Sequence, residues 1–206
     1  MSNKHLKDSK HLQIRKKIRQ LRRSIPPQAQ ADAARSVCSA ILQDPDFQAA
    51  QSLAFYQAFD GEIDPQLLMQ EALQAGKNCY LPVLDKNLPQ LLFAQYQPDT
   101  KLLANKFGIT EPPLYPNNTL SPENLDIIFL PLVAFDTAGT RLGMGQGFYD
   151  RTLATVHREA GDNSGKTPKL IGLGHECQRV ERLERAEWDV PLDMIVTDQT
   201  VYRVGP

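Results

Sequence analysis

The sequence has few cysteines and no long apolar run. Only Cys38, Cys79 and Cys177 occur in 206 residues, and no two of them form a Cys-x-x-Cys pair. This spacing is typical of neither a zinc knuckle nor a disulfide framework, so we expect a reducing, cytoplasmic setting. No apolar run approaches membrane-spanning length, and the first residues are basic and polar rather than signal-like. We therefore expect no association with membranes.

Several catalytic motifs are also missing. The four histidines show no metal-ligand spacing, so a zinc site is not expected. No Ser-His-Asp or Cys-His arrangement is evident, and a nucleophilic mechanism has no support. Neither a Walker A motif nor Gly-x-Gly-x-x-Gly occurs, which removes the two commonest nucleotide-binding loops.

The most informative stretch is Arg141–Arg151, in which three glycines alternate with other residues. An apolar run at 126–135 precedes it and predicts a buried strand, and a helix is predicted at 148–159. A glycine loop between strand and helix presents backbone N–H groups that bind phosphate. Glycines in this position are also common in simple tight turns, so the phosphate interpretation depends on the charges nearby.

Those charges favour a metal–phosphate site. Asp150 is predicted in the first helical turn, where it suits the helix dipole but would repel a bound phosphate. A divalent cation between carboxylate and phosphate removes this conflict, and Mg²⁺ is usually held in this way. Arg141 and Arg151 could add charge-assisted bonds to the same anion. Asp189 or Asp193 could supply a second carboxylate, or either could be a cap or turn residue.

The amino-terminal segment is strongly basic. Residues 1–23 carry nine Lys and Arg residues against Asp8 alone, whereas the whole chain has a net charge of −1. Within a predicted helix, Arg15, Arg19 and Arg22 form a stripe beside the apolar stripe, from which they could reach a neighbouring cleft. A solvated basic face and a nucleic-acid contact are alternative interpretations.

Strands alternating with helices predict an α/β domain with a mostly parallel sheet covered on both faces. We expect a disordered basic tail at 1–10 and one domain at 11–206. Helices are predicted at 11–25, 28–42, 65–75 and 148–159, and strands at 52–56, 78–83, 91–96, 126–135, 170–174, 194–197 and 201–204. A turn at 85–87, an irregular segment at 102–116 and a linker at 161–168 connect them. Ligands of such sheets bind at the carboxyl ends of the strands, where the glycine loop is placed.

These residues resemble the 5-formyltetrahydrofolate cyclo-ligase family, also called methenyltetrahydrofolate synthetase. The resemblance is carried by six segments: 130–136, 141–151, 61–64, 107–112, Gln178 and 189–193. It spans nearly the whole chain, and the spacing of Arg15 and Arg19 matches as well.

The resemblance implies a three-layer α/β domain of the NagB/RpiA/CoA-transferase-like type. We expect a monomer, since no surface stripe of the sequence demands a partner. It implies ATP- and Mg²⁺-dependent closure of 5-formyltetrahydrofolate to 5,10-methenyltetrahydrofolate, with release of ADP and phosphate. A regulatory protein that binds ATP or folate but turns over slowly is the alternative. A nucleic-acid partner is not implied.

The resemblance also implies the roles of particular residues. The implied catalytic residues are Arg141 and Asp150, and the implied metal ligands are Asp150 and Asp189. The implied ATP-binding residues are Arg15, Arg19, Arg141, Gly143, Gly145, Gln146, Gly147, Phe148 and Tyr149. The implied folate-binding residues are Gln57, Glu62, Met144, Gly145, Gln146, Gly147 and Phe148. From the residues alone, Glu62 is equally readable as a solvated glutamate in a turn.

Overall fold

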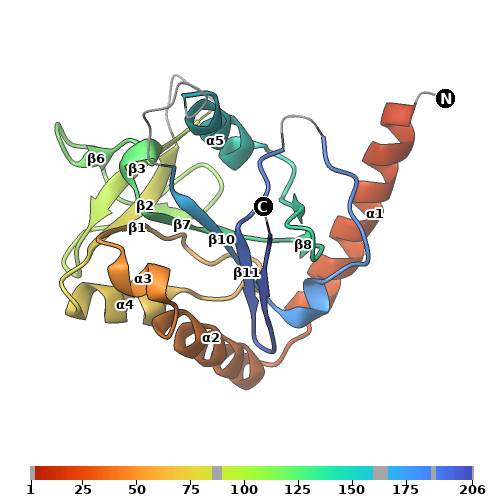
Figure 1. Ribbon diagram of the computed structural model, residues 1–206, viewed down its shortest axis with the longest axis horizontal. Coiled ribbons are helices and arrows are strands. Elements are labelled where there is room, and N and C mark those ends of the chain that lie inside the picture. The colour runs from red at the N-terminus through yellow and green to blue at the C-terminus, as the bar shows by residue number, and fades with distance from the viewer. Residues whose placement is uncertain (1–2, 85–89, 160–166, 187–188, 206) are drawn as a thin grey trace.

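The computed structural model describes residues 3–84, 90–159, 167–186 and 189–205 (Figure 1). The predicted turn at 85–87 and most of the predicted linker at 161–168 lie outside these residues.

An eight-stranded sheet forms the centre of the domain. Its order is β12-β11-β10-β7-β1-β2-β3-β6. Neighbours from β11 to β2 are parallel, whereas the pairs β12–β11, β2–β3 and β3–β6 at the two sides are antiparallel. The strands are β1 Ser52–Ala54, β2 Asn78–Leu84, β3 Leu91–Tyr96, β6 Thr119–Leu120, β7 Ile127–Pro131, β10 Lys169–Gly174, β11 Met194–Thr197 and β12 Val201–Arg203. The predicted mostly parallel α/β sheet is confirmed.

Helices cover both faces of the sheet (Figure 1). On one face lie α2 (Pro27–Leu42), α3 (Pro45–Ala49) and α4 (Gln66–Gln74), and the apolar stripe of α2 packs there on Leu53 and Phe129. On the other lies α5 (Phe148–Glu159), whose Leu153 packs with Leu130 and Ile128. The buried strands read as continuous apolar runs because both of their faces are covered.

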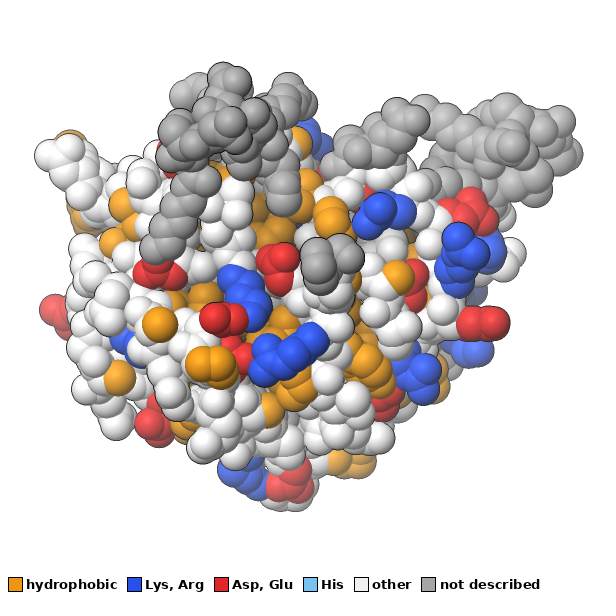
Figure 2. Space-filling view, viewed as in Figure 1, with side chains coloured by type: hydrophobic (Ala, Val, Ile, Leu, Met, Phe, Trp, Pro, Cys, Tyr) orange, Lys and Arg blue, Asp and Glu red, His pale blue; other side chains and the backbone are white. Residues whose placement is uncertain are grey.

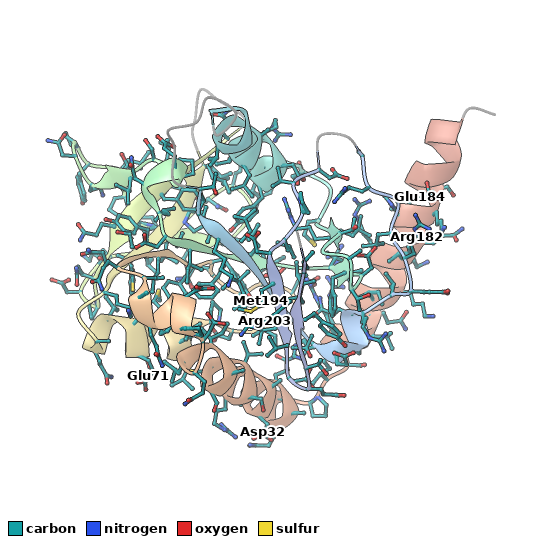
Figure 3. All side chains as sticks on the ribbon, viewed as in Figure 1. Asp32, Glu71, Arg182, Glu184, Met194 and Arg203 are labelled. Carbon is teal, nitrogen blue, oxygen red and sulfur yellow. The ribbon has the colours of Figure 1, made fainter. Side chains whose placement is uncertain are left out.

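The first helix, α1 (Asn3–Arg23), lies at one end of the sheet beside a small second sheet (Figure 1). Ile18 of α1 is buried there against Val133, Ala134 and Leu142. The helix begins at Asn3, so residues 3–10 are helical where the sequence predicts a disordered tail. At this end of α1, Lys10 pairs with Glu184 at 3.5 Å, and Figure 3 shows Glu184 beside the helix.

The predicted strand at 126–135 is wrong in one respect, because the structure divides it. β7 ends at Pro131, and β8 (Ala134–Phe135) pairs instead with β9 (Arg141–Leu142) in the second sheet. Proline cannot donate to a ladder, and the next carbonyl groups bond to side chains: the Leu132 carbonyl accepts from Arg22 and Gln178. The predicted irregular segment at 102–116 also contains two short strands, β4 (Leu103–Ala104) and β5 (Thr110–Glu111).

The sheet has a topological switch point between β1 and β7. From β1 the chain crosses to β2 on one side, and from β7 it crosses to β10 on the other. The residues that follow β1 and β7 therefore leave the same edge of the sheet and diverge, and this is the place where ligands of such sheets bind. The glycine loop and Glu62 both belong to these two connections.

We expect Gly139→Ala to destabilise the protein more than Gly76→Ala. Both glycines have positive φ, +80° and +76°, so alanine at either position costs about 1 kcal/mol. A Cβ at Gly139 would also lie 2.7 Å from the Leu192 carbonyl oxygen, whereas one at Gly76 would meet nothing within 4 Å. Urea unfolding should give a loss of about 3 kcal/mol for Gly139→Ala. Equal losses in the two variants would contradict the close approach of Leu192.

Candidate functional site

The glycine loop lies between α1 and α5 and is bonded by an arginine side chain from each helix. Gly145 and Gly147 have φ of +96° and +65°, a conformation that side chains with a Cβ rarely adopt. Arg15 of α1 donates from Nε to the Gly143 carbonyl at 2.8 Å, and Arg151 donates from Nη2 to the Gln146 carbonyl at 2.8 Å. Two carbonyl groups of the loop are therefore hydrogen-bonded by arginine side chains, so the loop does not need its own N–H groups to bond these carbonyl groups.

Arg141 and Asp150 form an ion pair at the base of the loop. Arg141 reaches across from β9 to the first turn of α5, and only 7% of its side chain is exposed. A second guanidinium nitrogen donates to the Val190 carbonyl. Burial lowers the pKa of Arg141, while Asp150 and Asp189 oppose that shift.

Asp150 lies within the electrostatic reach of Asp189, whose Oδ2 also accepts from the Ala186 N–H at 2.7 Å. Burial raises the pKa of Asp150, Arg141 opposes the shift, and the negative charge of Asp189 adds to it. A cation between the two carboxylates would relieve this repulsion. Among the described residues no three or more His, Cys, Asp or Glu side chains cluster as a metal site. Two carboxylates suit Mg²⁺, which takes its other ligands from phosphate and water.

The other aspartate considered from the sequence is a backbone cap. Asp193 accepts from the Leu170 N–H at 2.7 Å, and the Asp193 N–H in turn donates to the Leu170 carbonyl at 3.0 Å. Its carboxylate is therefore used in joining β10 to the segment before β11.

Glu62 lies in a tight turn that follows β1. Asp60 and Gly61 both have positive φ, 58° and 77°, and the Phe59 N–H donates to Glu62 Oε2 at 3.1 Å. Only 8% of the Glu62 side chain is exposed. The interpretation of Glu62 as a solvated turn residue is therefore wrong.

Burial raises the pKa of Glu62 to about 7, against the opposing effects of Arg22 and the Phe59 N–H. Its negative charge also reaches Tyr149 of α5, whose pKa is raised first by burial and then by Glu62, while Arg141 acts in the opposite direction. Tyr149 thus lies within the electrostatic reach of both Glu62 and the Arg141–Asp150 pair.

The arginine stripe of α1 points inward. Arg22 is fully buried, which excludes a solvated basic face at that position. Arg19 donates to Asp60 Oδ2 at 2.7 Å, so it meets the Glu62 turn, whereas Arg15 meets the glycine loop. One helix face therefore touches both connections at the switch point.

Aromatic side chains border the loop on its outer side. The ring of Phe107 lies edge-on to that of Phe148 at 6.1 Å, and Arg151 lies over the Phe148 ring at 5.2 Å. Phe107 belongs to one of the family-like segments but was given no role from the sequence. Of the other implied folate residues, Met144 is 40% exposed and Gln57 is half-buried just beyond β1.

Several polar residues behind the site received no role from the sequence, although Gln178 is among the family-like segments. Gln178 is fully buried and bonds the Leu132 and Val133 carbonyls, and His175 Nε2 lies 3.2 Å from the Gly61 carbonyl oxygen. Asp60 binds three arginines of α1. The arginine stripe of α1 was the one sequence feature that indicated an anionic partner, but no pattern in the sequence identified Asp60 as that partner.

The fold and this site define an α/β domain whose ligand site lies at the switch point, between a cation-lined glycine loop and a buried carboxylate.

The model of the 5-formyltetrahydrofolate cyclo-ligase family matches residues 7–198. The 5-formyltetrahydrofolate cyclo-ligase of Haemophilus influenzae is 44% identical over 189 residues, 91% of this chain and 97% of the relative. The 5-formyltetrahydrofolate cyclo-ligase of Escherichia coli is 40% identical over 186 residues, which cover 90% of this chain and 98% of the relative.

A solved structure agrees with these relatives. The NMR structure of Aquifex aeolicus 5,10-methenyltetrahydrofolate synthetase matches with a TM-score of 0.78 and 30% identity, covering 94% of this chain and 92% of that one. The chain belongs to the 5-formyltetrahydrofolate cyclo-ligase family and is an enzyme, which confirms the family predicted from its motifs.

We expect Glu62→Gln to remove a pH-dependent loss of stability. The pKa of Glu62 is raised from 4.5 to about 7 in the folded protein, so its contribution is fully present below pH 4.5 and is lost as the pH rises to about 7. The loss amounts to about 3 kcal/mol. The free energy of unfolding, measured in urea from pH 4.5 to 8, should fall less steeply in Glu62→Gln than in wild type.

The exposed substitution Glu181→Gln is the control, and it should follow the wild-type pH dependence. Parallel curves for wild type and Glu62→Gln would mean that Glu62 is ionised in the fold as it is in water.

Proposed function

We propose that this enzyme closes 5-formyltetrahydrofolate to 5,10-methenyltetrahydrofolate with consumption of Mg-ATP. The observation that carries the proposal is that one face of α1 contacts both sides of the site: Arg15 donates to the Gly143 carbonyl of the glycine loop at 2.8 Å, and Arg22 donates to Glu62 at 3.3 Å. A carboxylate suited to ring N–H donors and a cationic phosphate cradle are thereby adjacent, as the meeting of two substrates requires.

The chemistry explains why both are needed. A formamide oxygen is a poor leaving group, so water cannot depart when N10 attacks the formyl carbon. Transfer of the γ-phosphoryl group from ATP to that oxygen gives an iminophosphate and ADP. N10 then bonds to the same carbon, its proton is released, and the C–O bond breaks with phosphate as the leaving group. Positioning and charge stabilisation supply most of such catalysis.

The glycine loop is suited to the triphosphate. The loop N–H groups of Gly143 to Gly147 and the first N–H groups of α5 form the cradle, and Arg15 and Arg141 flank it. Mg²⁺, held by Asp150 and Asp189, would neutralise charge on the β- and γ-phosphates when bound. Arg19, although paired with Asp60, keeps a third of its side chain exposed toward solvent. It retains N–H groups for a phosphate.

The folate would lie on the Glu62 side of the same loop. Glu62 accepts hydrogen bonds from the N–H donors of the reduced pterin, and Gln57 lies earlier in the same connection, nearer to the end of β1. Met144 and Phe148 border the ring, and the loop backbone between them forms the wall shared with ATP.

The competing interpretations differ in what they predict in solution. Mixing the protein with Mg-ATP and 5-formyltetrahydrofolate should give the absorbance of methenyltetrahydrofolate above an enzyme-free control. Folded protein that binds both ligands without product would instead be a regulatory binding protein. Nucleic-acid binding by the basic segment at 1–23 would instead be steeply salt-dependent and lost when that segment is deleted. On the face seen in Figure 2, acidic and basic side chains are interspersed.

Asp150→Ala should lower kcat by roughly a thousandfold, because a metal ligand contributes several kcal/mol of charge stabilisation. Since this change leaves buried Arg141 without its partner, Asp150→Asn, which keeps an acceptor oxygen, is measured beside it. Asp32→Ala, at an exposed position on α2 seen at the bottom of Figure 3, is the control and should keep wild-type turnover. Full Mg²⁺-dependent activity in folded Asp150 variants would refute the metal assignment.

Arg15→Ala should raise the KM for Mg-ATP about tenfold or more and leave that for folate within about twofold, because charge-assisted bonds contribute about 1.5–3 kcal/mol. Lys16→Ala removes a neighbouring exposed charge and tests for a general effect of net charge. Steady-state kinetics with each substrate varied in turn measures both constants. Equal increases in the two KM values would argue against a phosphate contact.

A further inference from the structure

Arg22 reaches the switch point from the last turns of α1 and is fully buried there. Its Nε donates to the Asp60 carbonyl at 2.7 Å, and its Nη1 donates to the Leu132 carbonyl at 2.8 Å. Its Nη2 donates to Asp60 Oδ2 at 2.9 Å and to Glu62 Oε1 at 3.3 Å. All three guanidinium nitrogens are therefore engaged, on the two connections that follow β1 and β7.

Such an arrangement is costly if it serves packing alone. Burying a guanidinium costs several kcal/mol, and apolar residues of similar volume often replace a buried ion pair without loss of stability. What apolar residues cannot supply is a planar fork that fixes a carboxylate in one orientation. Here Nη2 donates both to Asp60 Oδ2 at 2.9 Å and to Glu62 Oε1 at 3.3 Å, so Arg22 holds the two carboxylates of this turn in place relative to each other.

We propose that Arg22 is a positioning residue of the folate site, acting through Glu62 to set the orientation and charge of its carboxylate. This rests on the proposed function, in which Glu62 accepts hydrogen bonds from the reduced pterin.

The groups around Glu62 make Arg22 the decisive cation. Arg22 and Arg19 face it from α1, Asp60 from its own turn, Tyr56 from the segment after β1, and Tyr149 from α5. Among these described groups the two arginines and the Phe59 N–H favour the ionised carboxylate, and Arg22 is the cation that is hydrogen-bonded to it. Without that charge Glu62 becomes more readily neutral, and a neutral carboxyl loses half of its acceptor capacity toward ring N–H groups.

The neighbouring Arg23 offers a matched control. It pairs with the other carboxylate oxygen of Asp60, and 55% of its side chain is exposed. Arg23→Lys therefore perturbs the same turn through Asp60 without removing a bond to Glu62.

The first test compares Arg22→Lys and Arg23→Lys with wild type. Arg22→Lys should raise the KM for 5-formyltetrahydrofolate about tenfold, because one ammonium cannot reproduce the fork, and leave kcat and the KM for Mg-ATP within about twofold. Arg23→Lys should leave all three constants within about twofold. A purely structural role would instead lower the melting temperature of Arg22→Lys without a selective change in the folate KM.

The second test is the pH profile of the folate KM. In wild type this KM should fall as the pH rises through about 7, the pKa of Glu62. Arg22→Met removes the charge and should move this midpoint to higher pH by about one unit or more, whereas Arg22→Lys keeps the charge and the midpoint. An unchanged midpoint in folded Arg22→Met would overturn the proposal.

The third test remains decisive if Arg22→Met does not fold. Calorimetric binding of 5-formyltetrahydrofolate is measured for Arg22→Lys, Glu62→Gln and the double variant. If Arg22 acts through Glu62, Arg22→Lys weakens binding in wild type and has no further effect beside Glu62→Gln. Independent, additive losses would overturn the proposal.

The two levels of proposal fail differently. Wild-type protein that forms no methenyltetrahydrofolate refutes the proposed function. Normal wild-type turnover, together with equal increases of both KM values in Arg22→Lys, refutes the role of Arg22 alone.

Discussion

The buried guanidinium of Arg22 is the interaction on which the arrangement of this site depends. Its partners lie 38 and 110 residues further along the chain, at Asp60 and Leu132, so it joins three segments that no local pattern brings together. Asp60 has a positive φ that a residue with a Cβ rarely adopts, and it keeps that conformation under hydrogen bonds from α1. Burial alone would raise the pKa of Asp60, but the three arginines hold it below its usual value. The turn that carries Glu62 is thereby fixed against the end of the sheet.

The site places opposite charges close together without allowing them to neutralise one another completely. On one side, Arg141 pairs with Asp150, and the negative charge of Asp189 acts on both of them. On the other, Glu62 keeps a pKa of about 7, so its charge responds to whatever binds beside it. This separation suits two substrates of which one is strongly anionic and the other presents N–H donors.

Some elements follow directly from local sequence. The helix predicted at 148–159 is observed with the same ends, because glycines precede it, an acidic residue occupies its first turn and its apolar residues keep helical spacing. The sheet strands at 91–96 and 194–197 are likewise as predicted. In contrast, the apolar run at 126–135 was divided at Pro131, because buried side chains of Arg22 and Gln178 take the carbonyl groups that would have continued the ladder. No periodicity signals that substitution.

The same distinction between local sequence and tertiary contacts applies to the candidate site. Sequence by itself determined the family, the mostly parallel α/β sheet and the glycine loop with its Arg141 and Asp150, since these depend on contiguous motifs and on repeating apolar patterns. Only the tertiary structure decided that Glu62 is buried, that Arg19 and Arg22 turn toward Asp60 while Arg15 turns toward the loop, and that Asp193 is a cap. Burial and ion pairing depend on which distant segments meet, and a carboxylate or guanidinium has the same local sequence signature whether it meets water or another charge.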